Sequence, residues 1–210
     1  MRRRPRKALT IASEDGDTVG GPRLPSGEGR RRFPCLRPPV DRRIATLQFL
    51  EVCSPAVAEV FHYWDGKRAG RALPLRSDID PNELRRHLTG IVLVEVRRDP
   101  LDFVYRLVGT REVAARGNDP TGKRVAESWY GSSAQDVLAN YERVVASRSF
   151  LYDFDVFVRS GGRRVQDESL FMPLATDGEE VGQIMVYSYY GDTWAGSRPT
   201  ARKLLPVLDE

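Results

Sequence analysis

Four carboxylates lie on neighbouring segments that read as β-strands, and they are the residues best suited to chemistry. Asp153 and Asp155 lie in the alternating run 150–158, and Asp167 and Glu168 lie in the next run, 165–174. A hairpin would bring them together, and carboxylates held this way can bind a metal ion or act as general acid and base. The alternation also places Asp153 and Asp155 on one common side. A solvated outer face of the sheet is therefore the interpretation we favour.

The other reactive residue types lie apart from one another. His62 and His87 each stand alone beside helix-forming residues, without a cysteine or a serine elbow. Cys35 and Cys53 lack the spacing of metal ligands, which favours a reduced, cytoplasmic protein. The glycines match neither phosphate-binding fingerprint. We therefore expect no catalytic residue, no metal site and no enzyme activity.

The hydrophobic pattern predicts the sheet that would position the carboxylates. Strands are predicted over 91–96, 103–109, 150–158, 165–174 and 181–190. A helical turn closed by Gly117 and a helix from Ser133 to Ser147 lie between the second and third strands.

Two further helices are predicted nearer the N-terminus. The first is amphipathic, covers about 45–64, and is interrupted or restarted where Ser54 caps and Pro55 opens a new turn. In the stretch DPNE, Asp80 has the position of an N-cap for a short helix that reaches about Leu88.

The basic charge of the chain lies at its N-terminus. The chain has 33 Lys and Arg against 29 Asp and Glu, and residues 1–43 hold 12 and 5 of these. This segment is rich in Arg, Gly and Pro and lacks apolar periodicity, which predicts a disordered tail. Its arginines could bind nucleic acid or an anionic membrane surface, but a solvated leader is the interpretation we favour. No run approaches the roughly 18 apolar residues that a membrane span needs.

The order of two strands, a helical crossing and a three-strand meander resembles a PAS domain over about residues 90–190, with GNDPTGKRV as the connection after the short helix. The resemblance implies an α+β fold. Its five-stranded antiparallel sheet has adjacent first and last strands and helices on one face. The disordered tail (1–43) and an N-terminal helix and strap (44–89) would precede it, and a C-terminal tail (191–210) would follow it.

A second set of motifs is similar to a family of short bacterial PAS-like proteins of the alphaproteobacterial type. They are the pair Tyr63-Trp64, Arg68 to Gly70, Pro74 and Arg76, Asp78 to Pro81, and Arg106 to Thr110. This stretch is either a strap that holds the N-terminal helix on the sheet or a surface that faces a partner. The candidate residues are Tyr63, Trp64, Arg68, Pro74, Arg76, Asp80, Pro81 and Arg106.

The resemblance also allows the cofactor chemistry of PAS domains to be checked. The helix 133–147 contains no His, where many haem-binding relatives place their ligand, and neither Cys lies in the predicted core helices to form a flavin adduct. The cofactor therefore stays unknown. What remains is either a ligand pocket or an ordinary filled core, formed by Tyr105, Trp129, Phe154, Met172 and Val186.

Together these features predict a non-catalytic, PAS-like sensory or regulatory module of the cytoplasm. It would act through protein–protein contacts that a small ligand in the sheet–helix cavity can modulate. The alternative is an anion-binding adaptor whose basic tail holds nucleic acid or membrane. The expected partners are an unidentified signalling protein and a second copy of the chain, with Leu47, Leu50 and Val57 near the dimer contact.

Overall fold

The computed structural model describes residues 42–131, 133–158, 164–177 and 179–191. An antiparallel sheet forms its centre, with the strand order β1-β4-β5-β6-β2-β3. The strands are β1 (Arg43–Ile44), β2 (Ile91–Arg97), β3 (Asp102–Val108), β4 (Leu151–Val158), β5 (Arg164–Ala175) and β6 (Val181–Gly191). The five predicted strands are β2 to β6, and the first and last of them pair as expected. The short β1 adds a sixth.

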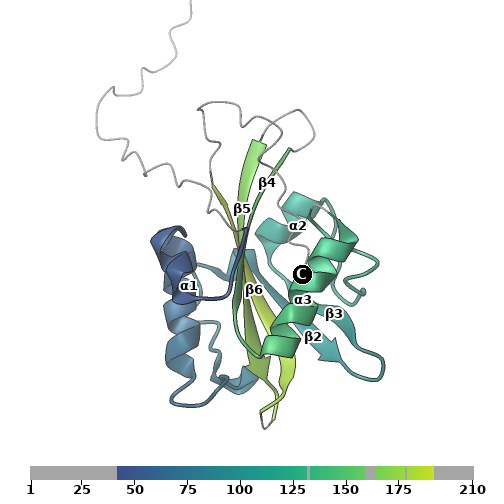
Figure 1. Ribbon diagram of the computed structural model, residues 1–210. Helices are drawn as coiled ribbons and strands as arrows, with labels where there is room; N and C mark the ends of the chain where they lie inside the picture. Colours follow the sequence, from purple (N-terminus) through teal and green to yellow (C-terminus); the bar gives the residue numbers. More distant parts are fainter. Residues whose placement is uncertain (1–41, 132, 159–163, 178, 192–210) are drawn as a thin grey trace, which may run out of the picture. The chain divides into compact units, whose positions relative to one another are not determined.

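Helices cover both faces of this sheet. Figure 1 shows α1 (Pro55–Lys67) on one side, and α2 (Thr110–Arg116) and α3 (Ala134–Ser147) on the other. On the first face, Trp64 Nε1 donates to the carbonyl oxygen of Pro173 in β5 at 3.0 Å. On the second, the ring of Tyr141 in α3 packs edge-on against Phe171, with centroids 5.2 Å apart. The expected α+β PAS-like fold is confirmed, and the N-terminal helix lies on the face opposite the two crossing helices.

Capping residues begin and end these helices where the sequence predicts. Ser54 Oγ accepts from the backbone N–H of Val57 at 3.4 Å, with Pro55 at the first helical position. Ser133 Oγ accepts from the N–H of Asp136 at 3.0 Å. Helix α2 ends at Gly117, whose φ of 78° is a left-handed conformation that favours glycine.

The predicted helix over 45–64 is wrong in its first half. A 3-10 helix, η1 (Leu47–Glu51), takes its place, because Phe49 turns inward and stacks on Tyr152 of β4 with centroids 5.2 Å apart. Val57 is fully buried within its own chain, so its side chain presents no surface to a second copy. Leu50 is partly buried against the same core, whereas Leu47 is 60% exposed.

The helix predicted to start at Asp80 is also absent from the described residues. Asp80 Oδ1 accepts from the N–H of Asn82 at 2.8 Å, which makes a local turn, and residues 81–87 stay in turns until η3 (Leu88–Gly90). Glu83 cannot complete a capping box, because its carboxylate pairs with Lys67 Nζ at 2.6 Å. Another 3-10 helix, η2 (Arg76–Asp78), precedes this turn.

The predicted boundary of the tail at residue 43 lies too far along the chain. Arg43 belongs to β1, and the carbonyl oxygen of Arg42 accepts from the N–H of Phe154 in β4 at 2.8 Å. The rest of the expected tail, 1–41, and most of the C-terminal segment, 192–210, lie outside the described residues. Within the described part, no helix is long and apolar enough to cross a membrane.

Candidate functional site

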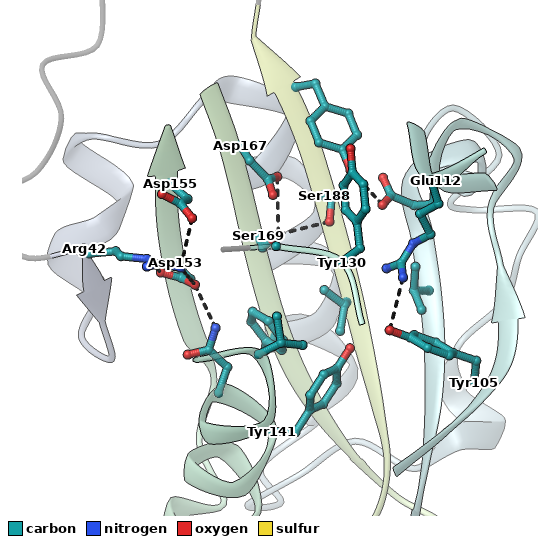
Figure 2. Close-up of a pocket in the computed structure, with 18 residues that line it drawn as sticks. Arg42, Tyr105, Glu112, Tyr130, Tyr141, Asp153, Asp155, Asp167, Ser169 and Ser188 are labelled. Carbon is teal, nitrogen blue, oxygen red and sulfur yellow. Dashed lines mark hydrogen bonds and ion pairs between the residues drawn. The ribbon is translucent and has the colours of Figure 1, made fainter. Parts of the chain in front are cut away.

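A small cavity lies between the sheet and helices α2 and α3 (Figure 2), and its wall combines charged and hydroxyl-bearing side chains with Val92, Val137, Phe171 and Val186. Its volume is about 50 Å³. The charged residues in its wall are Arg42, Glu112, Arg116, Asp153, Asp155 and Asp167. The tyrosines are Tyr105, Tyr130, Tyr141 and Tyr190. Side chains alternate between the two faces of a strand, and the cavity residues on β3 to β6 are those that face α2 and α3.

One wall of the cavity is an ion-paired cluster at the β4 edge. Arg42 Nε donates to Asp153 Oδ1 at 2.8 Å, and Arg42 Nη2 lies 3.1 Å from Asp155 Oδ2. Asn140 of α3 donates Nδ2 to Asp153 Oδ2 at 2.7 Å. Asp153 is only 6% exposed, and these charge-assisted bonds offset the cost of burying its carboxylate.

The opposite wall combines arginine, tyrosine and a buried glutamate. Arg116 of α2 donates Nη1 to the Tyr105 hydroxyl at 3.1 Å, and its guanidinium lies over the rings of Tyr105 and Tyr130, 5.0 and 5.1 Å from their centroids. Tyr190 donates its hydroxyl to Glu112 Oε2 at 2.8 Å. Burial raises the pKa values of Tyr105, Tyr141 and Tyr190, so these phenols stay protonated donors at neutral pH.

Between the two walls lie Asp167 and Ser169 of β5 and Ser188 of β6, as Figure 2 shows. The hydroxyls of Ser169 and Ser188 are 3.0 Å apart, and Ser169 Oγ lies 3.4 Å from Asp167 Oδ1. Burial raises the pKa of the Asp167 carboxyl well above its usual range, and the neighbouring carboxyl groups of Glu112, Asp153 and Asp155 raise it further.

Only part of the predicted pocket lies here. Tyr105 and Val186 line the cavity. Phe154 and Met172 are buried, but they alternate with cavity residues and so lie on the other face of the sheet, under α1. Trp129 is 42% exposed and does not line the cavity.

The strand carboxylates do not form the solvated outer face that the sequence favoured. Asp153, Asp155 and Asp167 share one face, as the alternation predicts, but that face lies under α3. Glu168 points to the α1 side, where its Oε2 accepts from the N–H of Ser54 at 2.7 Å. Within the described residues, no group of three or more His, Cys, Asp or Glu side chains is arranged to hold a metal ion.

Sequence reasoning missed most of the cavity wall, including its charged residues Arg42, Glu112 and Arg116 and the amide of Asn140. Asn140 carried the clearest signal, because this polar residue lies on the apolar stripe of α3 between Val137 and Val144. Glu112 and Arg116 are four residues apart on α2 and so share one face. Arg42 gave no such signal, because it lies at the end of a basic tail.

The strap candidates lie on the opposite side of the sheet from the cavity or at its surface. The carbonyl oxygen of Pro74 accepts from the N–H of Ala175 at the end of β5 at 2.9 Å, and the Tyr63 hydroxyl accepts from the N–H of Asp80 at 2.8 Å. Trp64 is buried. These contacts hold the segment along the sheet and α1.

The remaining strap candidates make local contacts. Arg68 pairs with Asp65, and Arg76 Nη1 reaches the carbonyl oxygen of Ile79 at 3.4 Å. Pro81 is exposed in the turn. Arg106 lies apart from the strap, on β3, where it pairs with Glu95 at 2.8 Å.

Comparison with known proteins gives distant likenesses to solved structures. A light-oxygen-voltage (LOV) domain studied with a flavin analogue has a TM-score of 0.41 and 11% identity, covering 53% of this chain and 83% of that one. The LOV protein of Rhodobacter sphaeroides gives 0.37 and 10%, covering 52% and 66%, and the fungal photoreceptor VVD gives 0.39 and 10%, covering 65% and 96%. At these scores the likenesses carry no functional argument.

A search of the curated proteins finds no match. A protein-family model matches residues 52–186, from the turn before α1 into β6. The match spans most of the strap and of the cavity wall, so the chain belongs to the PAS domain family.

Proposed function

We propose that this PAS domain is a non-catalytic sensory module that binds a small polar molecule in the cavity between the sheet and helices α2 and α3. The composition of the cavity wall supports this most directly. A filled core would present apolar side chains alone, whereas carboxylates, guanidinium groups, hydroxyls and an amide share the lining of this space with four apolar side chains. Buried polar groups are costly unless they are hydrogen-bonded, so such a wall suits a polar occupant.

The chemistry of the reactive groups supports a module without catalysis. Burial raises the pKa of the Cys53 thiol to about 11, and the nearby Glu168 carboxylate adds to this effect. A nucleophilic cysteine needs the opposite shift. His87 lies outside the cavity, between the carboxylate of Glu59 and the hydroxyl of Tyr187, each 3.1 Å from a ring nitrogen.

Ligand binding can be tested on the protein purified from cells under native conditions. Native mass spectrometry should show an added small-molecule mass, and a crystal structure should show density in the cavity. The variant Ser188→Val places a larger apolar group in the wall and should lose the added mass. Ser147→Val changes an exposed serine at the end of α3 and should keep it. A cavity that stays empty of any molecule from cells would contradict the proposal.

The module would transmit its signal through contacts with other proteins in the cytoplasm. We propose that the first of these partners is a second copy of the chain. Leu47 supports this, since it is a large apolar side chain that is 60% exposed on η1. Sedimentation at micromolar concentration should show a dimer for the parent and a monomer for Leu47→Asp. Leu101→Asp, at a 47% exposed position in the β2–β3 turn, serves as the control. A monomeric parent would contradict the dimer.

A further inference from the structure

The cavity wall carries more negative than positive charge. Four carboxyl groups line it, those of Glu112, Asp153, Asp155 and Asp167, against the guanidinium groups of Arg42 and Arg116. The charge of Arg42 is already balanced, because its guanidinium pairs with Asp153 and Asp155 of β4. Arg116 donates to the Tyr105 hydroxyl and to the carbonyl oxygen of Ser128.

Asp167 therefore differs from the carboxylates beside Arg42. The hydrogen bond recorded for its side chain comes from Ser169 at 3.4 Å, which is long for a charged acceptor. Among the described residues, no Arg, Lys or His side chain forms an ion pair with it. Asp167 is partly buried, and a carboxylate without an ionic partner in such a setting favours either a proton or a cation.

Asn140 gives a second, independent indication that a ligand with hydrogen-bond donors fits the cavity. This residue lines the cavity, is 3% exposed, and uses its Nδ2 to donate to Asp153. Its Oδ1 is buried and has no hydrogen-bond donor within the described part of the chain. A buried acceptor without a donor is costly, so an occupant that carries N–H or O–H groups suits this wall.

Size and shape restrict the occupant further. One water molecule needs roughly 10–15 Å³ of cavity volume, so a cavity of about 50 Å³ admits an organic molecule of only a few heavy atoms. The tyrosine rings in the wall already attract a cation within the protein, since the guanidinium of Arg116 lies over Tyr105 and Tyr130, and the same attraction would act on an ammonium group. Among the described residues, no group of three or more His, Cys, Asp or Glu side chains is arranged to bind a metal ion as the cation of this cavity.

We infer that the ligand of this cavity is a small organic cation, an ammonium compound that pairs with Asp167 and packs against the tyrosine wall. The inference rests on the proposed function and specifies the chemical class of its ligand.

The test compares two probes of nearly the same size, ethanolammonium chloride and neutral ethylene glycol, added to the full-length protein at neutral pH. Ethanolammonium should raise the melting temperature progressively with concentration, beyond the effect of sodium chloride at equal ionic strength. Ethylene glycol should not. The effect should fall at least tenfold in apparent affinity in Asp167→Asn and persist in Asp177→Asn, which changes an exposed carboxylate in the β5–β6 turn.

Two outcomes would overturn the inference. If ethylene glycol stabilises the parent as well as ethanolammonium does, the cavity binds a neutral polar ligand, and the proposed function stands without the cation. If ethanolammonium has no effect on the parent and Asp167→Asn melts higher than the parent, Asp167 is neutralised by a proton instead. Asp167→Asn keeps the size of the side chain, and its own melting transition shows whether it has folded.

Discussion

Arg42 holds Asp153 across a large separation in the chain: its Nε donates to Asp153 Oδ1 at 2.8 Å, although the two residues are 111 positions apart. Arg42 directly precedes β1, whose Arg43 lies opposite Asp153 in the sheet. The ion pair therefore fixes this segment onto the wall of the cavity. An occupant that touches Asp153 or Asp155 would act directly on the attachment of the N-terminal segment.

Removal of this guanidinium should destabilise the fold. Arg42→Ala leaves Asp153, which is 6% exposed, without its ionic partner, and hydrogen bonds to charged groups contribute about 1.5–3 kcal/mol. We expect the free energy of unfolding in urea to fall by an amount in that range. Arg97→Ala is the matched control, because Arg97 is half exposed and pairs with Glu95 at the surface, where such pairs contribute about 0–1 kcal/mol. Equal losses in both variants would show that the Arg42 pair has no special role.

Stepwise truncation should locate the same attachment. Deletion of residues 1–40 should leave the melting temperature unchanged, because their composition lacks a core-forming pattern. Deletion of residues 1–44 also removes Arg42 and β1, and it should lower the melting temperature by several degrees. The two deletions differ by only four residues, so each serves as the control for the other. A loss already complete in the shorter deletion would show that the first 40 residues pack against the domain.

The strand carboxylates show how far the sequence can predict the site. Period-two alternation correctly places Asp153 and Asp155 on one side of β4. Alternation alone cannot say which side is buried, because that depends on where α3 packs after a long-range crossing. The partners that make burial tolerable come from distant segments: Asn140 from α3 and Arg42 from a stretch that reads as tail.

The apolar residues have the same limitation. Phe154 and Met172 are correctly predicted to be core residues, but both faces of this sheet are covered, so being apolar does not decide between them. Elements with strong local signals are predicted best, such as α3, which is capped by Ser133, and α2, which ends at Gly117. The segment after Asp80 is predicted to be a helix but forms turns, because the Glu83 carboxylate pairs with Lys67 and not with the backbone N–H groups.

The strap offers a direct comparison of two aspartates. Asp78 Oδ2 accepts from the N–H of Leu75 at 2.8 Å and also pairs with Arg71. Asp80 makes its hydrogen bonds to Asn82 at an exposed turn. We expect Asp78→Ala to cost about 0.5–2 kcal/mol, as the loss of a capping side chain does, and Asp80→Ala to cost less. Urea melts of the two variants provide the measurement, and a larger loss for Asp80→Ala would contradict the contacts described here.

Asp167 should give stability a recognisable pH dependence. Its pKa in the folded protein is raised by burial and by Glu112, Asp153 and Asp155, so its favourable contribution is complete below the unfolded pKa of about 3.9 and is lost as pH rises through the folded value. Asn cannot ionise, so Asp167→Asn removes the loss of stability that this carboxyl group causes as the pH rises. The variant should be more stable than the ligand-free parent at neutral pH, and the difference should shrink in acid.

The measurement is the difference in free energy of unfolding between variant and parent across this pH range. Asp177→Asn, which changes an exposed carboxylate, is the control and should show only a small difference. If Asp167→Asn is less stable than the ligand-free parent at neutral pH, Asp167 is ionised and paired with another group of the protein, contrary to the contacts described above.

Gly90 is a position at which its neighbours leave no room for a side chain. A Cβ added there would lie 2.8 Å from the carbonyl oxygen of Ser188 and would collide with the guanidinium of Arg111, which packs over the rings of Tyr187 and Tyr190. Gly90→Ala should therefore cost about 1–3 kcal/mol through overpacking, despite the general gain that alanine brings over glycine. Gly66→Ala is the control, because Gly66 lies inside α1 with open space around its added Cβ, and alanine should stabilise that helix by up to about 1 kcal/mol. Urea unfolding of the two variants should move the midpoint in opposite directions, and a Gly90→Ala protein as stable as the parent would show that Arg111 and the backbone at Ser188 can both shift at no cost.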